Sequence, residues 1–243
     1  MLFSFVPLSK VPPMKTKAFT LIELLVVIAI IAALAAFAVP ALTSALTRGQ
    51  MTGTLNNARQ FYLAGYQMAL DGSSNSDPTL TWPGDDQNAA TLTLQTYCAK
   101  LVKNDYLKAG DLTKLLSAPG ASCTVTASTP DATTGDVTIT YAAGTPALKV
   151  YKVKDADAAN TIFAVTKNYT YDMALTSASS PFGDKGFVII RKGGDAAILR
   201  KNNATAVSGQ EPAFQSSVGK RPGDPDGSGG VTPGDSSQSL PPQ

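Results

Sequence analysis

The longest apolar run of the chain lies between Lys17 and Arg48, and it contains a single ionisable side chain, Glu23. A helix of about 20 residues is enough to cross the hydrocarbon core of a bilayer, so this run predicts a membrane-spanning helix. An isolated carboxylate in hydrocarbon costs on the order of 3 kcal/mol or more, and such groups normally have a partner. Glu23 is therefore the first candidate functional residue.

Beyond this run the apolar residues recur at helical spacing, which predicts that the same helix continues to about Leu70. The Asp71-Gly72 pair and the polar residues after it indicate the helix end, at a total length of roughly 75 Å. Residues 19–47 are expected to form the apolar half, and residues 48–72 an amphipathic half that packs against a head. The predicted buried stripe consists of Met51, Leu55, Ala58, Tyr62, Tyr66 and Ala69.

The middle of this helix is expected to be its weakest part. Pro40 removes one backbone hydrogen bond, and Gly49 and Gly53 each lower helix propensity by about 1 kcal/mol relative to alanine. Pro40 therefore predicts at least a simple kink.

After residue 120 the helical spacing gives way to alternation between apolar and polar residues. Six strands are predicted, separated by Gly, Pro, Asp or Asn, at residues 123–126, 136–141, 147–153, 161–166, 186–191 and 196–201. Two short helices precede them, at 91–104 and 111–117. A long helix followed by consecutive strands predicts an α+β fold, in which an antiparallel sheet of the head, residues 73–205, packs on the helix.

Residues 206–243 lose this periodicity, and a tail rich in Gly, Pro, Ser and Asp is typical of disorder. The tail also resembles a twelve-residue EF-hand calcium loop with Gly229 at its sixth position. The candidate ligands, at loop positions one, three, five, nine and twelve, are Asp224, Asp226, Ser228, Thr232 and Asp235. The last ligand is Asp in place of the usual Glu, and no helical pattern flanks the loop. Weak calcium binding therefore stands as an alternative to a plain disordered tail.

The composition argues against several functions. The 243 residues carry a formal net charge of +2 and include no histidine, which argues against a nucleic-acid surface and removes His-based catalytic and metal sites. The closest carboxylate pairs, Asp85-Asp86 and Asp155 with Asp157, lie in predicted loops and are interpreted as solvated turns. We therefore predict a protein that is not an enzyme and needs no cofactor, weak calcium aside.

The two cysteines, Cys98 and Cys123, are expected to lie outside the cytoplasm. An even pair in an oxidising compartment predicts a disulfide, which would contribute roughly 3–4 kcal/mol in the chain-entropy model. The alternative is two buried free thiols.

The stretch from Lys17 to Glu23, Lys-Ala-Phe-Thr-Leu-Ile-Glu, resembles the prepilin processing site of type IV pilins and type II secretion pseudopilins. The resemblance implies a basic cytoplasmic leader of residues 1–18, cleavage between Ala18 and Phe19, and methylation of the new amine of Phe19. It also implies that Glu23 pairs with the N-terminal amine of a neighbouring subunit.

Two further features bear on this resemblance. Pro40 stands where many family members have a proline, and the resemblance implies, as the alternative to a simple kink, a section of helix that melts or stretches in the filament. Ala18 replaces the usual glycine before the cut, which predicts slower cleavage. Met14 is a second candidate start, and it would give the short basic leader that is common in the family.

The function implied by the resemblance is that of a pilin-like structural subunit of a type IV pilus-like filament or a type II secretion pseudopilus. Its partners would be further copies of itself, other pilin-like subunits, the prepilin peptidase and methylase, an inner-membrane assembly platform and, before assembly, the lipid bilayer. Lysines before the span predict a single pass through the inner membrane with a cytoplasmic N-terminus. The alternative is a membrane-anchored periplasmic or surface binding module that forms no filament, for which Glu23 would be unnecessary.

Overall fold

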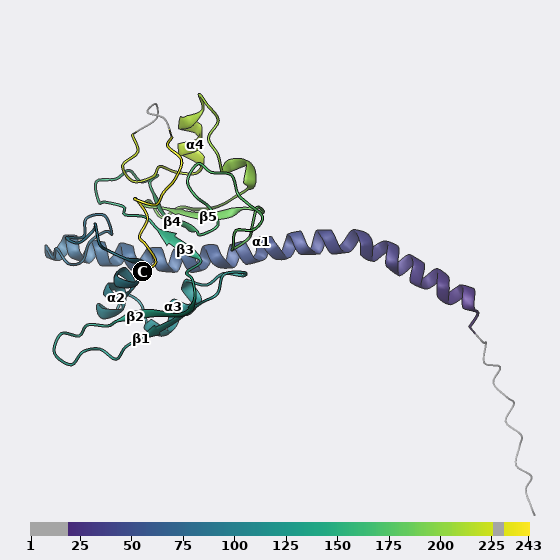
Figure 1. Ribbon diagram of the computed structural model, residues 1–243, viewed down its shortest axis with the longest axis horizontal. Coiled ribbons are helices and arrows are strands. Elements are labelled where there is room, and N and C mark those ends of the chain that lie inside the picture. Colours follow the sequence, from purple (N-terminus) through teal and green to yellow (C-terminus); the bar gives the residue numbers. More distant parts are fainter. Residues whose placement is uncertain (1–18, 226–230) are drawn as a thin grey trace, which may run out of the picture. The chain divides into compact units, whose positions relative to one another are not determined.

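The computed structural model describes residues 19–225 and 231–243 (Figure 1). It divides into two compact units, the first ending at Ala45 and the second running from Leu46 to Gln243. Helix α1, Leu21–Asn75, contributes residues to both units. The predicted leader, residues 1–18, lies outside the described residues.

Helix α1 is longer than its sequence predicts. It continues through Pro40 and past Gly72 to Asn75, so the predicted end near Leu70 is wrong by more than one turn. Gly72 is buried against the loop that follows the helix, and a Cβ atom at this position would collide with the backbone carbonyl of Leu80. The glycine therefore permits close packing of the loop and does not end the helix.

The predicted buried stripe of α1 is confirmed at five of its six positions, since Tyr66 is 42% exposed. Phe61 and Met68, which the predicted stripe omits, are fully buried. The buried face is wider than the predicted stripe because the 46–75 part of α1 is covered on two sides.

All six predicted strands are present, although they form two antiparallel sheets. The strands are β1 Cys123–Ala127, β2 Ile139–Gly144, β3 Leu148–Val150, β4 Ile162–Thr166, β5 Phe187–Arg191 and β6 Ala196–Leu199. Strands β1 and β2 pair with each other, and the larger sheet has the order β3-β4-β5-β6. Strand β2 does not pair with β3. The C-terminal segment lies along the outer edge of β3, where Tyr151 and Ser239 form an antiparallel bridge.

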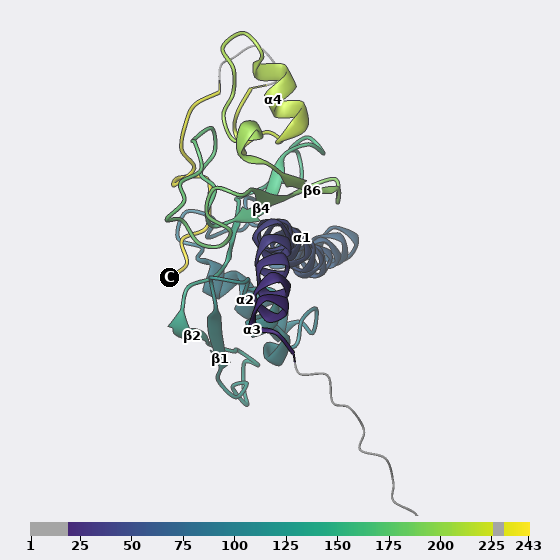
Figure 2. The same cartoon turned by 90° about the vertical axis from the view of Figure 1, so that its right-hand side faces the viewer.

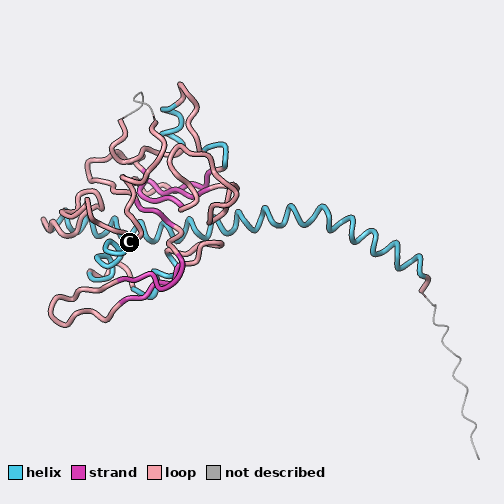
Figure 3. The backbone as a smooth tube through the Cα atoms, viewed as in Figure 1, coloured by secondary structure: helices cyan, strands magenta, loops and turns pink. Residues whose placement is uncertain are grey.

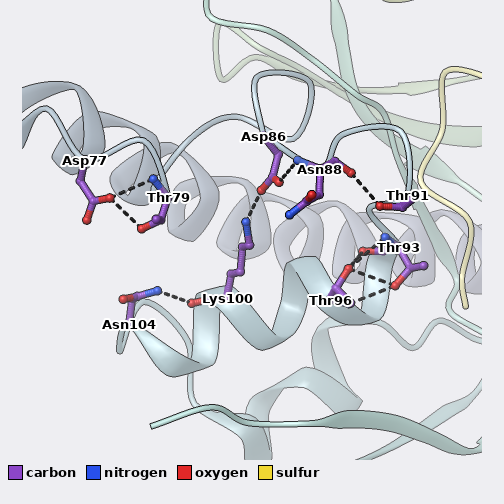
Figure 4. A network of polar contacts seen from close by, with 9 residues as sticks. All are labelled: Asp77, Thr79, Asp86, Asn88, Thr91, Thr93, Thr96, Lys100 and Asn104. Atoms are coloured by element: carbon purple, nitrogen blue, oxygen red, sulfur yellow. Dashed lines mark hydrogen bonds and ion pairs between the residues drawn. The ribbon is translucent and has the colours of Figure 1, made fainter. Parts of the chain in front are cut away.

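The second unit has helical and sheet layers on both sides of the 46–75 part of α1. The four-stranded sheet lies on one side, and α2 (Leu94–Lys103), α3 (Ala109–Leu115) and the β1-β2 pair lie on the other (Figures 1 and 2). Long loops connect these elements (Figure 3). Helix α2 begins with a capping box in which Thr93 and Thr96 exchange hydrogen bonds (Figure 4).

Strands β4 and β5 are buried along their whole length, as expected for central strands covered on both faces. Val188 packs with Met51 and Leu55 of α1. Its neighbour Phe187 points to the opposite face, where its ring stacks on Tyr169 with ring centroids 3.9 Å apart. The larger sheet therefore packs against α1 on one face and against the segments that follow β4 on the other.

The predicted disordered tail is instead folded in its described part. It contains helix α4, Glu211–Ser217, after a short 3₁₀ turn at Lys201–Asn203. The segment after residue 231 returns along β3, where Leu240 is buried in the main core. The Leu240 amide donates to the Val150 carbonyl at 2.7 Å, and the Lys152 amide donates to the Gln238 carbonyl at 2.7 Å. A few apolar residues and these hydrogen bonds order a tail whose composition is typical of disorder.

Candidate functional site

The first turn of α1 places Glu23 in a capping box with Thr20. The Glu23 Oε2 atom accepts hydrogen bonds from the Thr20 amide at 2.8 Å and from the Thr20 hydroxyl at 2.7 Å. In return the Glu23 amide donates to the Thr20 hydroxyl oxygen at 3.3 Å. The Thr-x-x-Glu spacing that produces such a box is readable in the sequence, so this role of Thr20 could have been predicted from it.

The surface around Glu23 is apolar and uncovered within the first unit. Leu21 is 83% exposed and Phe37 is 82% exposed, and Phe19, which precedes the helix, is exposed as well. The sequence has no further charged residue until Arg48. Helix α1 is long and apolar enough to cross a membrane, judged by length and composition. A helical surface that is apolar all round requires lipid or other protein around it.

Pro40 and Ala18 are the remaining predicted residues of this region. Pro40 lies within α1 without ending it, and the Thr43 hydroxyl donates to the Pro40 carbonyl oxygen at 2.9 Å. The role of Pro40 as a kink stays a prediction. Ala18, on the N-terminal side of the predicted cut, lies outside the described residues.

Cys98 of α2 and Cys123 of β1 are both buried, and both are free thiols. The predicted disulfide is therefore not confirmed. Burial raises the pKa of Cys98, and the nearby Cys123 raises it further. Burial also raises the pKa of Cys123, an effect that Lys167 opposes. Both thiols lie in the main core, and burial disfavours the reactive thiolate of each.

The two ends of the predicted calcium loop already have cationic partners. The Asp224 Oδ1 atom accepts hydrogen bonds from Arg221 at 2.8 and 3.2 Å. The Asp235 Oδ2 atom accepts one from the Lys149 ammonium at 2.6 Å and one from the Tyr151 hydroxyl at 2.7 Å. Thr232 is exposed, and Asp226 and Ser228 lie outside the described residues. Among the described residues, no group of three or more His, Cys, Asp or Glu side chains could hold a metal ion.

Calcium binding to this loop stays a prediction, and we expect an affinity no tighter than the order of millimolar. The ion would have to displace Arg221 from Asp224 and Lys149 from Asp235. Calorimetric titration of the full chain in detergent micelles should show a small heat that disappears in Asp224→Asn and Asp235→Asn. Absence of any calcium-dependent heat at millimolar calcium would contradict binding.

Comparison with known proteins gives one family match, and it falls on this N-terminal region. Residues 13–39 match the model of the prokaryotic N-terminal methylation motif, and the match includes Phe19 and Glu23. No curated protein and no solved structure matches the chain. The uncovered apolar part of α1, its single carboxylate Glu23 and this match agree with one another. The chain carries, at residues 13–39, the N-terminal methylation motif that is the signature of type IV pilins and pseudopilins.

Proposed function

We propose that the chain is a structural subunit of an extracytoplasmic filament, either a type IV pilus or a type II secretion pseudopilus, and that it assembles through its N-terminal helix after processing. The observation that carries this proposal is that the part of α1 in the first unit is apolar and uncovered, with Glu23 as its one carboxylate. A helix that served only as a membrane anchor would gain nothing from this charge.

The proposed assembly step is the pairing of two opposite charges, the N-terminal ammonium of Phe19 and the carboxylate of Glu23. Cleavage before Phe19 creates an ammonium at the start of α1, next to the first turn that holds Glu23. When helices pack together away from water, a buried ammonium and a buried carboxylate each require the other. Pairing between neighbouring subunits would fix the register of one helix against the next.

The proposed partners and location follow from the same motif. Copies of the chain and other pilin-like subunits would surround α1 in the filament, and lipid would surround it before assembly. A prepilin peptidase and methylase would process the leader, and an inner-membrane platform would add subunits. The head would then lie in the periplasm or along the filament. The alternative, an anchored binding module, has the same topology but forms no filament.

The proposal is tested first by the mature N-terminus. We expect mass spectrometry of the chain from its host membrane to give a protein that begins at Phe19 and carries a methyl group on its amine. This result follows from the match to the methylation motif. A stable protein that retains residues before Phe19, or that is cut elsewhere, would count against both the processing and the filament.

We also expect the exported chain to contain a bridge between Cys98 and Cys123, since both thiols are buried in the same core. Maleimide should label neither cysteine in denatured, unreduced protein, and both after reduction. In the native reduced chain labelling should be slow, because burial raises the pKa of both thiols. Full labelling without reduction would establish the free-thiol alternative.

A further inference from the structure

Exposed cations gather in the second unit near the end of the apolar run of α1. Arg48 is the first charged residue after that run, and it lies about one helical turn before Met51. Three further cations, Lys185, Arg200 and Lys201, belong to segments that lie near Met51, and all four cationic side chains are exposed. The proposed assembly contact does not use them.

The loop before β5 brings Lys185 next to this turn of α1. Gly186 is buried, and a Cβ atom there would lie 3.3 Å from the Met51 Cε atom and would collide with the Leu199 carbonyl oxygen. Gly186 therefore packs between α1 and the end of β6. Because Lys185 directly precedes Gly186, its backbone is held close to the part of α1 that carries Arg48.

Phe182 fixes the same loop on α1. It packs against a cluster formed by Met51, Leu55 and Val188. Its backbone has a φ of 68°, a left-handed conformation that is uncommon for residues other than glycine. Such a conformation persists where the surrounding packing holds it, so the fold presents Lys185 at a defined place.

The resulting surface is cationic. This junction surface consists of three segments, residues 46–55, 182–186 and 199–201. Its four cations face one carboxylate of the same segments, Asp184, which pairs with the Lys201 ammonium at 3.1 Å. Arg48, Lys185 and Arg200 form no ion pair with any residue in the described ranges, 19–225 and 231–243. Their charges therefore have no partner within the described chain.

The position of the junction surface along α1 matches the edge of a bilayer. At 1.5 Å per residue, the helix from Leu21 to Thr47 is about 40 Å long. A bilayer is about 40–45 Å thick when its headgroup layers are included. Helix α1 is long and apolar enough to cross a membrane, and a crossing helix of this length would bring Arg48 to the outer headgroup layer.

We propose that the junction surface docks on anionic lipid headgroups and holds the second unit against the membrane before assembly. The inference rests on the membrane insertion of α1 in the proposed function, and it does not depend on the filament. Each Lys or Arg near an anionic surface adds to the attraction, which falls off within a Debye length of about 10 Å. Zwitterionic headgroups have no net charge and would leave the three unpaired cations unbalanced.

The test uses the full chain in lipid nanodiscs, made either of phosphatidylcholine alone or of phosphatidylcholine with phosphatidylglycerol. Amide hydrogen exchange, read by mass spectrometry, should be about threefold or more slower at residues 182–186 in the anionic discs. Molar salt should remove this difference. Residues 154–158 serve as an internal reference that should not change, because Asp155 lies in the same pocket as Gly72, at the opposite end of the second unit's part of α1.

Two double variants test which cations are responsible. Arg48→Gln with Lys185→Gln should abolish the difference between the two kinds of disc. Lys108→Gln with Lys154→Gln removes the same charge from exposed positions near the other end of α1, and it should leave the difference unchanged.

The possible failures point to different conclusions. Equal exchange in the two kinds of disc, or the same loss in both double variants, would overturn this inference alone and leave assembly through Glu23 untouched. Failure of the chain to enter either disc would overturn the inference together with the proposed membrane location.

Discussion

A chain in which valine replaces Glu23 is expected to be cleaved and inserted into the membrane, yet to form few or no filaments. The substitution makes the apolar run more apolar, so insertion should not suffer. It leaves the Phe19 ammonium without its proposed partner, a loss of about 3–5 kcal/mol by analogy with broken buried ion pairs. A filament needs that contact at every added subunit. Electron microscopy of cells with the variant as the sole copy measures filament number, and mass spectrometry confirms the cut.

Two control variants separate the charge of Glu23 from its hydrogen bonds to Thr20. Glu23→Gln keeps an acceptor for the capping box but carries no charge, so it should also fail to assemble. Thr20→Ala keeps the charge and loses the two hydrogen bonds of the Thr20 hydroxyl, at a cost of about 0.5–2 kcal/mol to the helix start, and should still form filaments. Normal filaments from Glu23→Gln would reduce the role of Glu23 to helix capping. Normal filaments from Glu23→Val would overturn the proposed role of Glu23 in assembly.

The candidate site was readable from the sequence because its signals are local. The apolar run, the single Glu23 and the residues on either side of the cut lie within a short stretch. The six strands were also predictable, because alternation and β-branched residues act over neighbouring positions. What could not be predicted is which strands share a sheet. The free edge of β3 is occupied by a C-terminal segment in which Ser239 bridges Tyr151, 88 positions earlier in the sequence.

The folding of the tail could not be predicted for the same reason, because its stabilising contacts are made with residues distant in the sequence. Asp235 lies 86 residues from Lys149 along the chain, and only the fold brings the two together. The Leu94 amide at the start of α2 likewise donates a hydrogen bond to the Pro241 carbonyl at 2.8 Å. Composition predicts disorder when a segment has too few apolar residues to bury. Here the free edge of β3 and the partly buried ammonium of Lys149 supply the partners of the tail, and neither can be recognised in the local sequence.

The fold of the tail predicts that Asp235→Ala destabilises the second unit by about 3–5 kcal/mol. The side chain of Asp235 is 8% exposed and that of Lys149 is 19% exposed, so removing the carboxylate leaves a buried ammonium. Burial already lowers the pKa of Lys149, an effect that Asp235 opposes. Urea unfolding of the full chain in detergent micelles, followed by Trp82 fluorescence, measures the change in the free energy of unfolding.

Two comparisons decide whether this loss comes from a buried unpaired charge. Asp136→Ala removes one partner of an exposed ion pair with Lys103, and we expect little measurable change from it. Adding Lys149→Met to Asp235→Ala removes the stranded ammonium, so the double variant should recover much of the lost stability. If Asp235→Ala unfolds at the same urea concentration as the parent chain, the tail does not hold the edge of β3 in solution. If the double variant is no more stable than the single one, the stabilisation comes from the hydrogen bond to Tyr151 and the backbone contacts of the segment, because the charge of Lys149 then has no cost.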